Sequence, residues 1–490
     1  MSDQLSETTI ESILNSIRKF SEGISAELPF RDLRNRISSL KLPRFDWPAL
    51  EIGNLRARIP IIQGGMGVGI SLSNLASAVA EAGGIGVVAA NGIGMLEKDY
   101  YKDGRAANLR AFRREIQNAK SKTSGIIGVN IMVAVNDFHE LLDVAIEEKV
   151  DIIFMGAGLA IKDLPVKEMR EAGVKAAPIV SSARAATMIF RMWKKIYNDV
   201  PDAVVFEGPK AGGHLGFSEE QLEDPAFQLE AIVPEIIETL VPFEEEFGRQ
   251  IPVIAGGGVY SGEDIYEVLK LGAAGVQMGT RFVATEECDA DPAFKECYVE
   301  ADETDIGLIK SPVGMPGRAI RNQFILDTEA GERPSFRCAW QCLGSCKAEK
   351  ANYCISVALN NARRGKLKHG FVFAGTNAYR IEKIQTVTDL VGELEAGYRL
   401  QAQISTKSRA EALLERLSEL RRQYDRISQL IRETGAAYDQ ALKQKIRGLQ
   451  NAGMEELRER YTQLQTDMSE IQLKLADRLA ESCALFMKRV

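Results

Sequence analysis

Residues 251–282 read IPVIAGGGVYSGEDIYEVLKLGAAGVQMGTRF and contain a complete strand, helix and strand pattern. A short β-branched run at 251–255 ends in Gly256, Gly257 and Gly258. An amphipathic segment then begins at Ser261, and a second β-branched run follows at 275–282. The runs have the length of strands, and the segment between them has the length of a helix. Strands that alternate with helices in this way predict parallel pairing.

The same pattern recurs upstream and gives eight predicted strands: 59–63, 85–89, 125–133, 151–155, 176–180, 203–207, 251–255 and 275–282. Eight such repeats can close into a barrel. An open, doubly wound sheet is the alternative. It is disfavoured because the turn at Gly65 and Gly67 has Ile70 where a dinucleotide-binding turn needs its third glycine. We therefore predict an α/β protein with a (β/α)8 TIM barrel at 46–300.

The barrel is predicted to carry additional segments, because 490 residues exceed one ordinary core. Residues 1–45 predict an amphipathic, helical N-terminal arm, and 301–386 predict a cap. Residues 387–490 predict a helical hairpin extension similar to a coiled coil, since heptad runs occupy 413–431 and 454–475. These helices would pack on their own barrel or join subunits into a homo-oligomer, and the pattern leaves both open.

Composition excludes several classes of function. The chain is 45% hydrophobic and 26% charged, as globular proteins are. Its net charge of −7 argues against nucleic acid or anionic lipid as a partner. The N-terminus shows no targeting pattern, and no window has the apolar length of a membrane span, so we expect a cytoplasmic protein.

Candidate site residues follow the predicted strands, because barrel active sites lie at the carboxyl ends of strands. The turn after 59–63 contains Gly65 and Met66, and it could admit a flat ligand or be only a tight turn. Backbone amides at Gly257 and Gly258, and at Gly279 with Thr280, can bind phosphate.

A histidine follows the sixth predicted strand, in residues 204–216, VVFEGPKAGGHLG. Only three histidines occur in the chain, and His214 is the one predicted to lie at the barrel mouth. Imidazole exchanges protons near neutral pH, which favours a catalytic role over a purely structural hydrogen bond.

Taken together, these segments resemble the nitronate monooxygenase family, also called 2-nitropropane dioxygenases, and the related flavin-dependent enoyl-acyl-carrier-protein reductase. The resemblance covers roughly residues 50–385. It depends on IPIIQGGMG at 59–67, GVN at 128–130, EGPKAGGH at 207–214, the glycines at 256–258 and VQMGTRF at 276–282. Residues 311–318, SPVGMPGR, are similar to the segment that covers the active site in these families.

The resemblance implies a barrel that binds FMN and a small-molecule substrate. His214 matches the catalytic histidine, which acts as a base on neutral nitroalkanes or orients the nitronate anion. The implied cofactor-binding residues are Gly65, Met66 and Asn130 near the isoalloxazine, Gly213 in the histidine loop, and Gly257, Gly258, Gly279 and Thr280 at the phosphate.

Three functions remain open at this point. The first is nitronate oxidation with O2, which we prefer because no nicotinamide motif is visible. The second is NAD(P)H-dependent reduction of an enoyl thioester. The third is a non-catalytic flavoprotein scaffold assembled by the helical tail.

The predicted cap contains a cysteine cluster that departs from the family pattern, and an arginine whose role is open. Cys338, Cys342, Cys346 and Cys354 could hold an iron–sulfur cluster or zinc, or be reduced, redox-active thiols. Arg318 could meet an acidic group of a ligand, solvent or a carboxylate.

Overall fold

The computed structural model describes residues 46–406, 408 and 422. The predicted N-terminal arm and both predicted heptad runs therefore lie outside the described residues, and so does any subunit contact that they would make.

Eight parallel strands close into a barrel, in the order β10-β11-β3-β4-β5-β6-β7-β8. They are β3 (Ile61–Gln63), β4 (Ile85–Ala89), β5 (Ile126–Met132), β6 (Ile152–Gly156), β7 (Lys175–Val180), β8 (Val204–Glu207), β10 (Val253–Gly256) and β11 (Gly275–Met278). Neighbouring strands pair in parallel register, and β8 pairs with β10 to close the ring. The predicted (β/α)8 TIM barrel is confirmed.

The eighth predicted strand, 275–282, is twice as long as the observed strand β11, Gly275–Met278. The observed strand ends at Met278, and the short helix α10 (Thr280–Val283) follows. The helical turn directs the buried Arg281 toward Glu393, with Nη2 and Oε1 2.8 Å apart, and over the ring of Tyr260 at 4.4 Å. Arg281 and Glu393 are 112 residues apart in the chain, so a local sequence pattern cannot predict their contact.

Helices cover the outside of the barrel: α3 (Ser73–Glu81), α4 (Gly104–Lys122), α5 (Phe138–Glu147), α6 (Val166–Ala172), α7 (Ala183–Tyr197), α8 (Leu229–Phe247) and α9 (Gly262–Lys270). One apolar layer lies between strands and helices and includes Phe190, Trp193 and Phe206. A second, smaller layer fills the barrel itself and includes Ile62, Phe154 and Val205. Both faces of each strand are therefore buried, as parallel sheets require.

A hairpin closes the amino end of the barrel. Strands β1 (Leu50–Ile52) and β2 (Leu55–Ala57) pair antiparallel, and Leu50 and Ile52 belong to the apolar layer inside the barrel. The carboxyl end therefore remains as the place for a site.

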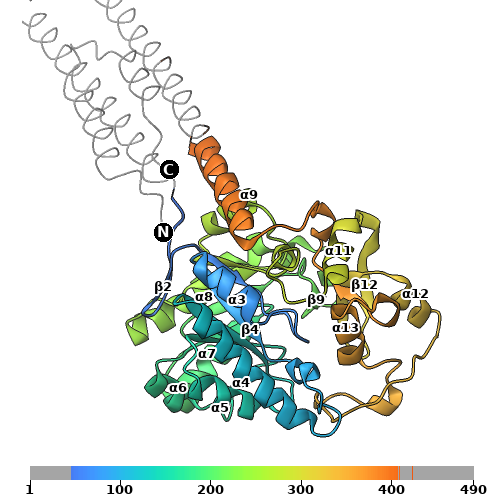
Figure 1. The fold of residues 1–490 in the computed structure, drawn as a ribbon. Helices are drawn as coiled ribbons and strands as arrows, with labels where there is room; N and C mark the ends of the chain where they lie inside the picture. Colours follow the sequence, from blue (N-terminus) through green and yellow to red (C-terminus); the bar gives the residue numbers. More distant parts are fainter. Residues whose placement is uncertain (1–45, 407, 409–421, 423–490) are drawn as a thin grey trace, which may run out of the picture. The chain divides into compact units, whose positions relative to one another are not determined.

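A small antiparallel sheet forms the cap. Strands β12 (Ile306–Lys310), β13 (Pro316–Ile320) and β14 (Val372–Phe373) pair in that order, and β13 also pairs with β9 (Gly213–His214). The helices α11 (Pro292–Glu300), α12 (Gln323–Glu329) and α13 (Ile355–Arg363) belong to the same part of the chain. Figure 1 shows β12, α12 and α13 apart from helices α4 to α7.

Residues 387–403 are helical. Leu390, Leu394 and Tyr398 are buried at helical spacing, and Tyr398 stacks on Trp47 with ring centroids 5.1 Å apart. Residues 44–403 form one compact unit. The domain boundaries proposed from the sequence stay predictions.

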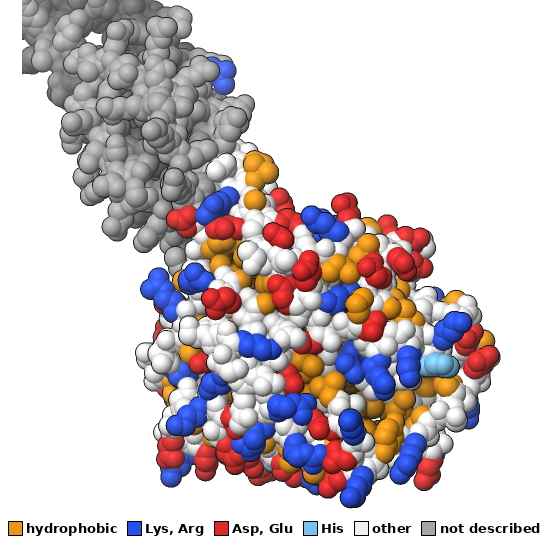
Figure 2. Space-filling view, in the orientation of Figure 1, with side chains coloured by type: hydrophobic (Ala, Val, Ile, Leu, Met, Phe, Trp, Pro, Cys, Tyr) orange, Lys and Arg blue, Asp and Glu red, His pale blue; other side chains and the backbone are white. Residues whose placement is uncertain are grey.

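Positively and negatively charged side chains are mixed over the face shown in Figure 2. Within the part of the chain that the structure describes, no helix combines the length and the hydropathy needed to span a membrane.

Packing between β4 and α3 gives the first testable prediction. A Cβ on Gly86 would collide with the carbonyl oxygen of Ala76, which is backbone and cannot move aside. We expect Gly86→Ala to lower the unfolding free energy by about 3 kcal/mol. Gly392→Ala is the matched control, because a Cβ there meets nothing within 4 Å, and removing a helical glycine stabilises by about 0.5–1 kcal/mol. Thermal unfolding by calorimetry measures both, and an unchanged melting temperature for Gly86→Ala would contradict this packing.

Candidate functional site

Side-chain alternation along the strands determines what faces the barrel mouth. Val205 lies inside the barrel and Phe206 lies outside, so Glu207 at the end of β8 faces inward. The same alternation turns Asn130 inward near the end of β5 and Gln277 inward in β11. Polar side chains from three strands therefore line the carboxyl end of the barrel.

The loops after β10 and β11 expose backbone N–H groups. Gly257 and Gly258 have φ of +89° and +102°, and a Cβ on Gly257 would lie 2.6 Å from the carbonyl oxygen of Gly208. Only glycine fits this conformation and this close approach. Within residues 46–406, the N–H groups of Gly257, Gly258 and Gly279 have no hydrogen-bond partner. Unpaired amides at neighbouring strand ends form a cradle that suits a phosphate.

The loop after β3 is bound to the loop after β11. The amide of Gly64 donates to the carbonyl of Met278 at 2.8 Å, and a Cβ on Gly279 would lie 3.8 Å from Sδ of Met66. The missing side chain of Gly65 makes room for Asn130, whose Cβ occupies the place that a residue-65 side chain would need. Met66, Asn130 and Gly279 are thus brought to one side of the mouth.

His214 belongs to the cap sheet as much as to the barrel. It pairs with Gly317 across the β9 and β13 strands, and its Nε2 lies 2.7 Å from Oγ of Ser311. The ring packs edge-on against Phe373 at 5.0 Å between centroids. Burial lowers the pKa of His214 to about 4, so the imidazole is neutral at physiological pH.

Arg318 has a different role from those expected. Its guanidinium is buried and donates from Nη1 to the carbonyl oxygens of Pro209 and Ala211, at 2.6 and 2.7 Å. Burial lowers its pKa. Arg318 meets no carboxylate there, and it fixes the loop that carries His214.

A second cap segment covers the glycine loops. The amide of Gly375 donates to Oγ1 of Thr280 at 3.1 Å, and Nδ2 of Asn377 donates to the carbonyl of Gly258 at 2.7 Å. The amide of Thr376 donates to the carbonyl of Lys210 at 3.2 Å. The cap therefore contacts both ends of the candidate site.

Cys338, Cys342, Cys346 and Cys354 are unpaired thiols. Among the described residues, no three His, Cys, Asp or Glu side chains are arranged to hold a metal ion. The predicted zinc site is therefore not found, and the predicted iron–sulfur cluster stays a prediction.

Sequence reasoning missed Glu207 and Ser311. Burial without a compensating partner raises the pKa of Glu207 to about 7. The two-residue alternation of 204–207 was a usable signal for Glu207. Ser311 begins the segment 311–318 that the resemblance places over the active site, but its contact with His214, 97 residues away, has no local signal.

The fold and the site define a (β/α)8-barrel protein with an amide cradle and a capped histidine at the carboxyl end of its strands. The chain belongs to the nitronate monooxygenase family, whose model matches residues 50–397.

Individual relatives are distant. A (3aS,4S,5R,7aS)-5-hydroxy-7a-methyl-1-oxo-octahydro-1H-indene-4-carboxyl-CoA dehydrogenase of Mycobacterium tuberculosis is 28% identical over 56% of this chain, and the match spans 66% of that protein, just under two thirds. A probable nitronate monooxygenase of Staphylococcus saprophyticus is 26% identical over 61% of this chain and 86% of its own. The structure of FabK from Thermotoga maritima superposes with a TM-score of 0.56 at 29% identity, covering 71% of this chain and 95% of that one.

The position of Arg318 gives the second prediction. Arg318→Met leaves two carbonyl oxygens without their charged donor, and each such bond is worth about 1.5–3 kcal/mol. We expect amide hydrogen exchange in residues 208–216 to accelerate about 10- to 100-fold. Arg56→Met is the control, because the Arg56 side chain is 74% exposed. Exchange rates equal to those of the unmodified protein would exclude the proposed support of the histidine loop.

The pKa of Glu207 gives the third prediction. Because this pKa is raised above its unfolded value, the native state binds the proton more tightly, and the stabilisation is lost as pH rises through about 7. Glu207→Gln should therefore unfold at a higher temperature than the parent at about pH 8 and at a similar temperature at about pH 5. Melting curves of both proteins across this range provide the measurement. A temperature difference that does not vary with pH would refute the assignment.

Proposed function

We propose that this protein is an FMN-dependent oxidoreductase, with its reaction at the carboxyl end of the barrel. The observation that carries the proposal is the convergence of unpaired amides at Gly257, Gly258 and Gly279 with a neutral His214 at one end of a barrel of this family. The amides suit the phosphate of FMN, and the cap would exclude water from the reacting atoms.

Each loop would bind a different part of the cofactor. Gly257, Gly258, Gly279 and Thr280 would hold the phosphate through backbone N–H groups. Met66, Asn130 and the backbone of Gly65 would contact the isoalloxazine, with Gly213 opposite in the histidine loop, where a Cβ would meet nothing within 4 Å. Bound FMN would supply the transfer of electrons between the substrate and the second reactant.

His214 would handle a proton. A neutral imidazole has one nitrogen lone pair, so it can accept the α-proton of a neutral nitroalkane and leave a nitronate anion. The imidazolium formed would then stabilise that anion. Ser311 orients the ring through its hydrogen bond to Nε2.

The finer form of the proposal is oxidation of alkyl nitronates with O2. It is supported by the family and by the neutral state of His214. The second candidate is NAD(P)H-dependent reduction of an enoyl thioester. The similarity to a carboxyl-CoA dehydrogenase and to FabK favours it.

The two candidates differ in the electron donor. The purified protein, loaded with FMN, would be mixed anaerobically with an alkyl nitronate or with NADPH, and the flavin absorbance would be followed. Bleaching by the nitronate alone supports nitronate oxidation, and bleaching by NADPH alone supports the reductase. Failure to bind FMN would overturn the proposal as a whole.

The role of His214 gives the fourth prediction. His214→Asn should bind FMN but lose activity toward a neutral nitroalkane about 10²- to 10⁴-fold, the usual contribution of a general base. Activity toward the pre-formed nitronate should fall much less, because no proton then has to be removed. His139→Asn and His369→Asn are matched controls, since both of these histidines are exposed. Equal losses on both substrates would exclude a role as base.

A further inference from the structure

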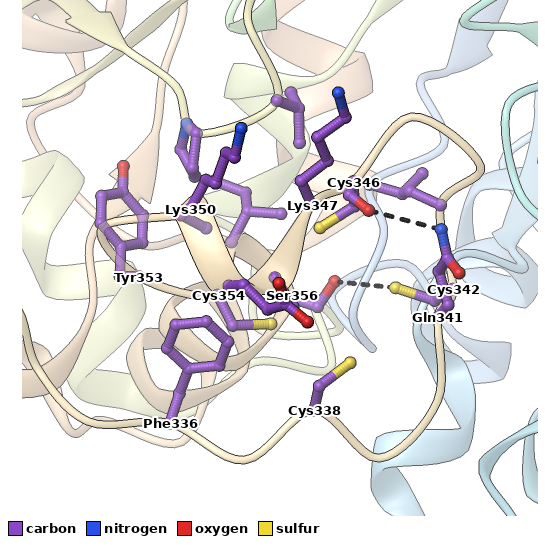
Figure 3. A pocket seen from close by; sticks show the side chains of 17 residues that line it. Phe336, Cys338, Gln341, Cys342, Cys346, Lys347, Lys350, Tyr353, Cys354 and Ser356 are labelled. Carbon is purple, nitrogen blue, oxygen red and sulfur yellow. Dashed lines mark hydrogen bonds between the residues drawn. The ribbon is translucent and has the colours of Figure 1, made fainter.

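Four cysteines of the cap line one cavity. Cys338, Cys342, Cys346 and Cys354 surround a space of about 360 Å³, and Figure 3 shows their sulfur atoms directed into it. They come from one stretch between α12 and α13, with Cys354 directly before α13. No two of them form a disulfide.

The fold fixes this stretch on the barrel mouth. The amide of Asn136 donates to the carbonyl of Cys342 at 3.0 Å, the amide of Gly344 donates to the carbonyl of Ala134 at 3.2 Å, and Val135 pairs with Leu343. These contacts attach the segment to the loop that follows β5, the strand that carries Asn130. The positions of the thiols are therefore set by the fold.

A helix N-terminus and two lysines border the cavity. Cys354 is the N-cap residue of the nine-residue helix α13. Burial raises the pKa of its thiol, and the nearby backbone amides of Val357 and Ser356 partly offset this rise. Helix N-termini stabilise thiolates and anionic groups. Lys347 and Lys350 also line the cavity, together with one carboxylate, Glu349.

The size of the cavity favours a cluster over a single metal ion. Four thiolates on one zinc ion, at about 2.3 Å each, must crowd together, whereas no group in the described part of the chain has the arrangement of a single-ion site. A cluster of several irons and sulfides places its cysteine ligands farther apart around a larger core. A cavity of about 360 Å³ has room for such a core.

We propose that Cys338, Cys342, Cys346 and Cys354 ligate a four-iron, four-sulfur cluster at the rim of the barrel mouth. The cavity that they line also includes Pro312 and Val313, and the adjacent Ser311 contacts His214. The cluster therefore lies beside the cap loop that orients the histidine. Binding of the cluster does not rest on the proposed function. Any exchange of electrons between the cluster and the barrel would rest on that function.

The fifth prediction tests the cluster directly. The full chain would be purified without oxygen, reconstituted with ferrous iron and sulfide, and analysed for iron, sulfide and electron paramagnetic resonance after reduction with dithionite. We expect about four irons and four sulfides per chain and the signal of a reduced cubane cluster. Stoichiometric zinc, or no retained iron, would overturn the proposal. Flavin content is measured separately, so a failure of FMN binding cannot be mistaken for a failure of the cluster.

Variants locate the ligands. The double variant Cys342→Ser with Cys354→Ser should lose the signal and most of the iron, whereas Cys297→Ser should retain both, because Cys297 lies in α11 and does not line the cavity. Circular dichroism verifies that each variant is folded. If the double variant misfolds, the single variant of the exposed Cys338, Cys338→Ser, takes its place. A full cluster in a folded variant would refute the assignment.

Discussion

The candidate site depends on the pairing of two short strands that lie more than 100 residues apart in the chain. Gly213 and His214 pair with Gly317 and Arg318, and this register connects the barrel loop to the cap sheet. Arg318 reinforces the pairing, because its buried guanidinium donates hydrogen bonds to two carbonyl oxygens of the histidine loop. Without this pairing, a long loop could place the side chain of His214 in many positions. The pairing fixes the backbone that carries it.

The two halves of the site are built by different means. The amide cradle is formed by backbone at the ends of β10 and β11, where parallel strands and positive φ angles position the N–H groups without side chains. On the histidine side, two side chains of the cap contact the ring of His214: Ser311 forms a hydrogen bond with it, and Phe373 packs edge-on against it. The barrel therefore supplies the amide cradle and the histidine loop, and the cap positions the ring of His214. A change of cap could change the substrate without disturbing the cradle.

The division between barrel and cap also explains which parts of the fold and of the candidate site can be predicted from the sequence. Each barrel strand is a local run of β-branched residues bounded by glycine, so periodicity finds it, and most bounds differ by at most two residues. The glycines at 256–258 are found for the same reason. Ser311 and the true role of Arg318 depend on pairing between β9, two residues long, and a distant strand. So short a strand has no period, and a contact so far along the chain leaves no local pattern. Glu207 is an intermediate case. The alternation of residues along its strand predicts that its side chain points inward, but only the fold shows that its carboxyl is buried without a compensating partner.

Burial acts on two titratable groups at the mouth in opposite directions and moves both toward neutrality. Desolvation disfavours a charged form of either sign, so the pKa of His214 falls to about 4 and that of Glu207 rises to about 7. Near neutral pH the imidazole is uncharged, and the buried carboxyl binds its proton more tightly than an exposed glutamate does. The unpaired amides of Gly257, Gly258 and Gly279 then contribute a larger share of the local potential, and their hydrogens give it a positive sign. An anionic ligand can therefore enter with little repulsion, and its charge would raise the pKa of His214 once it is bound. A bound anion would therefore favour the imidazolium form of the histidine, which in turn stabilises the anion.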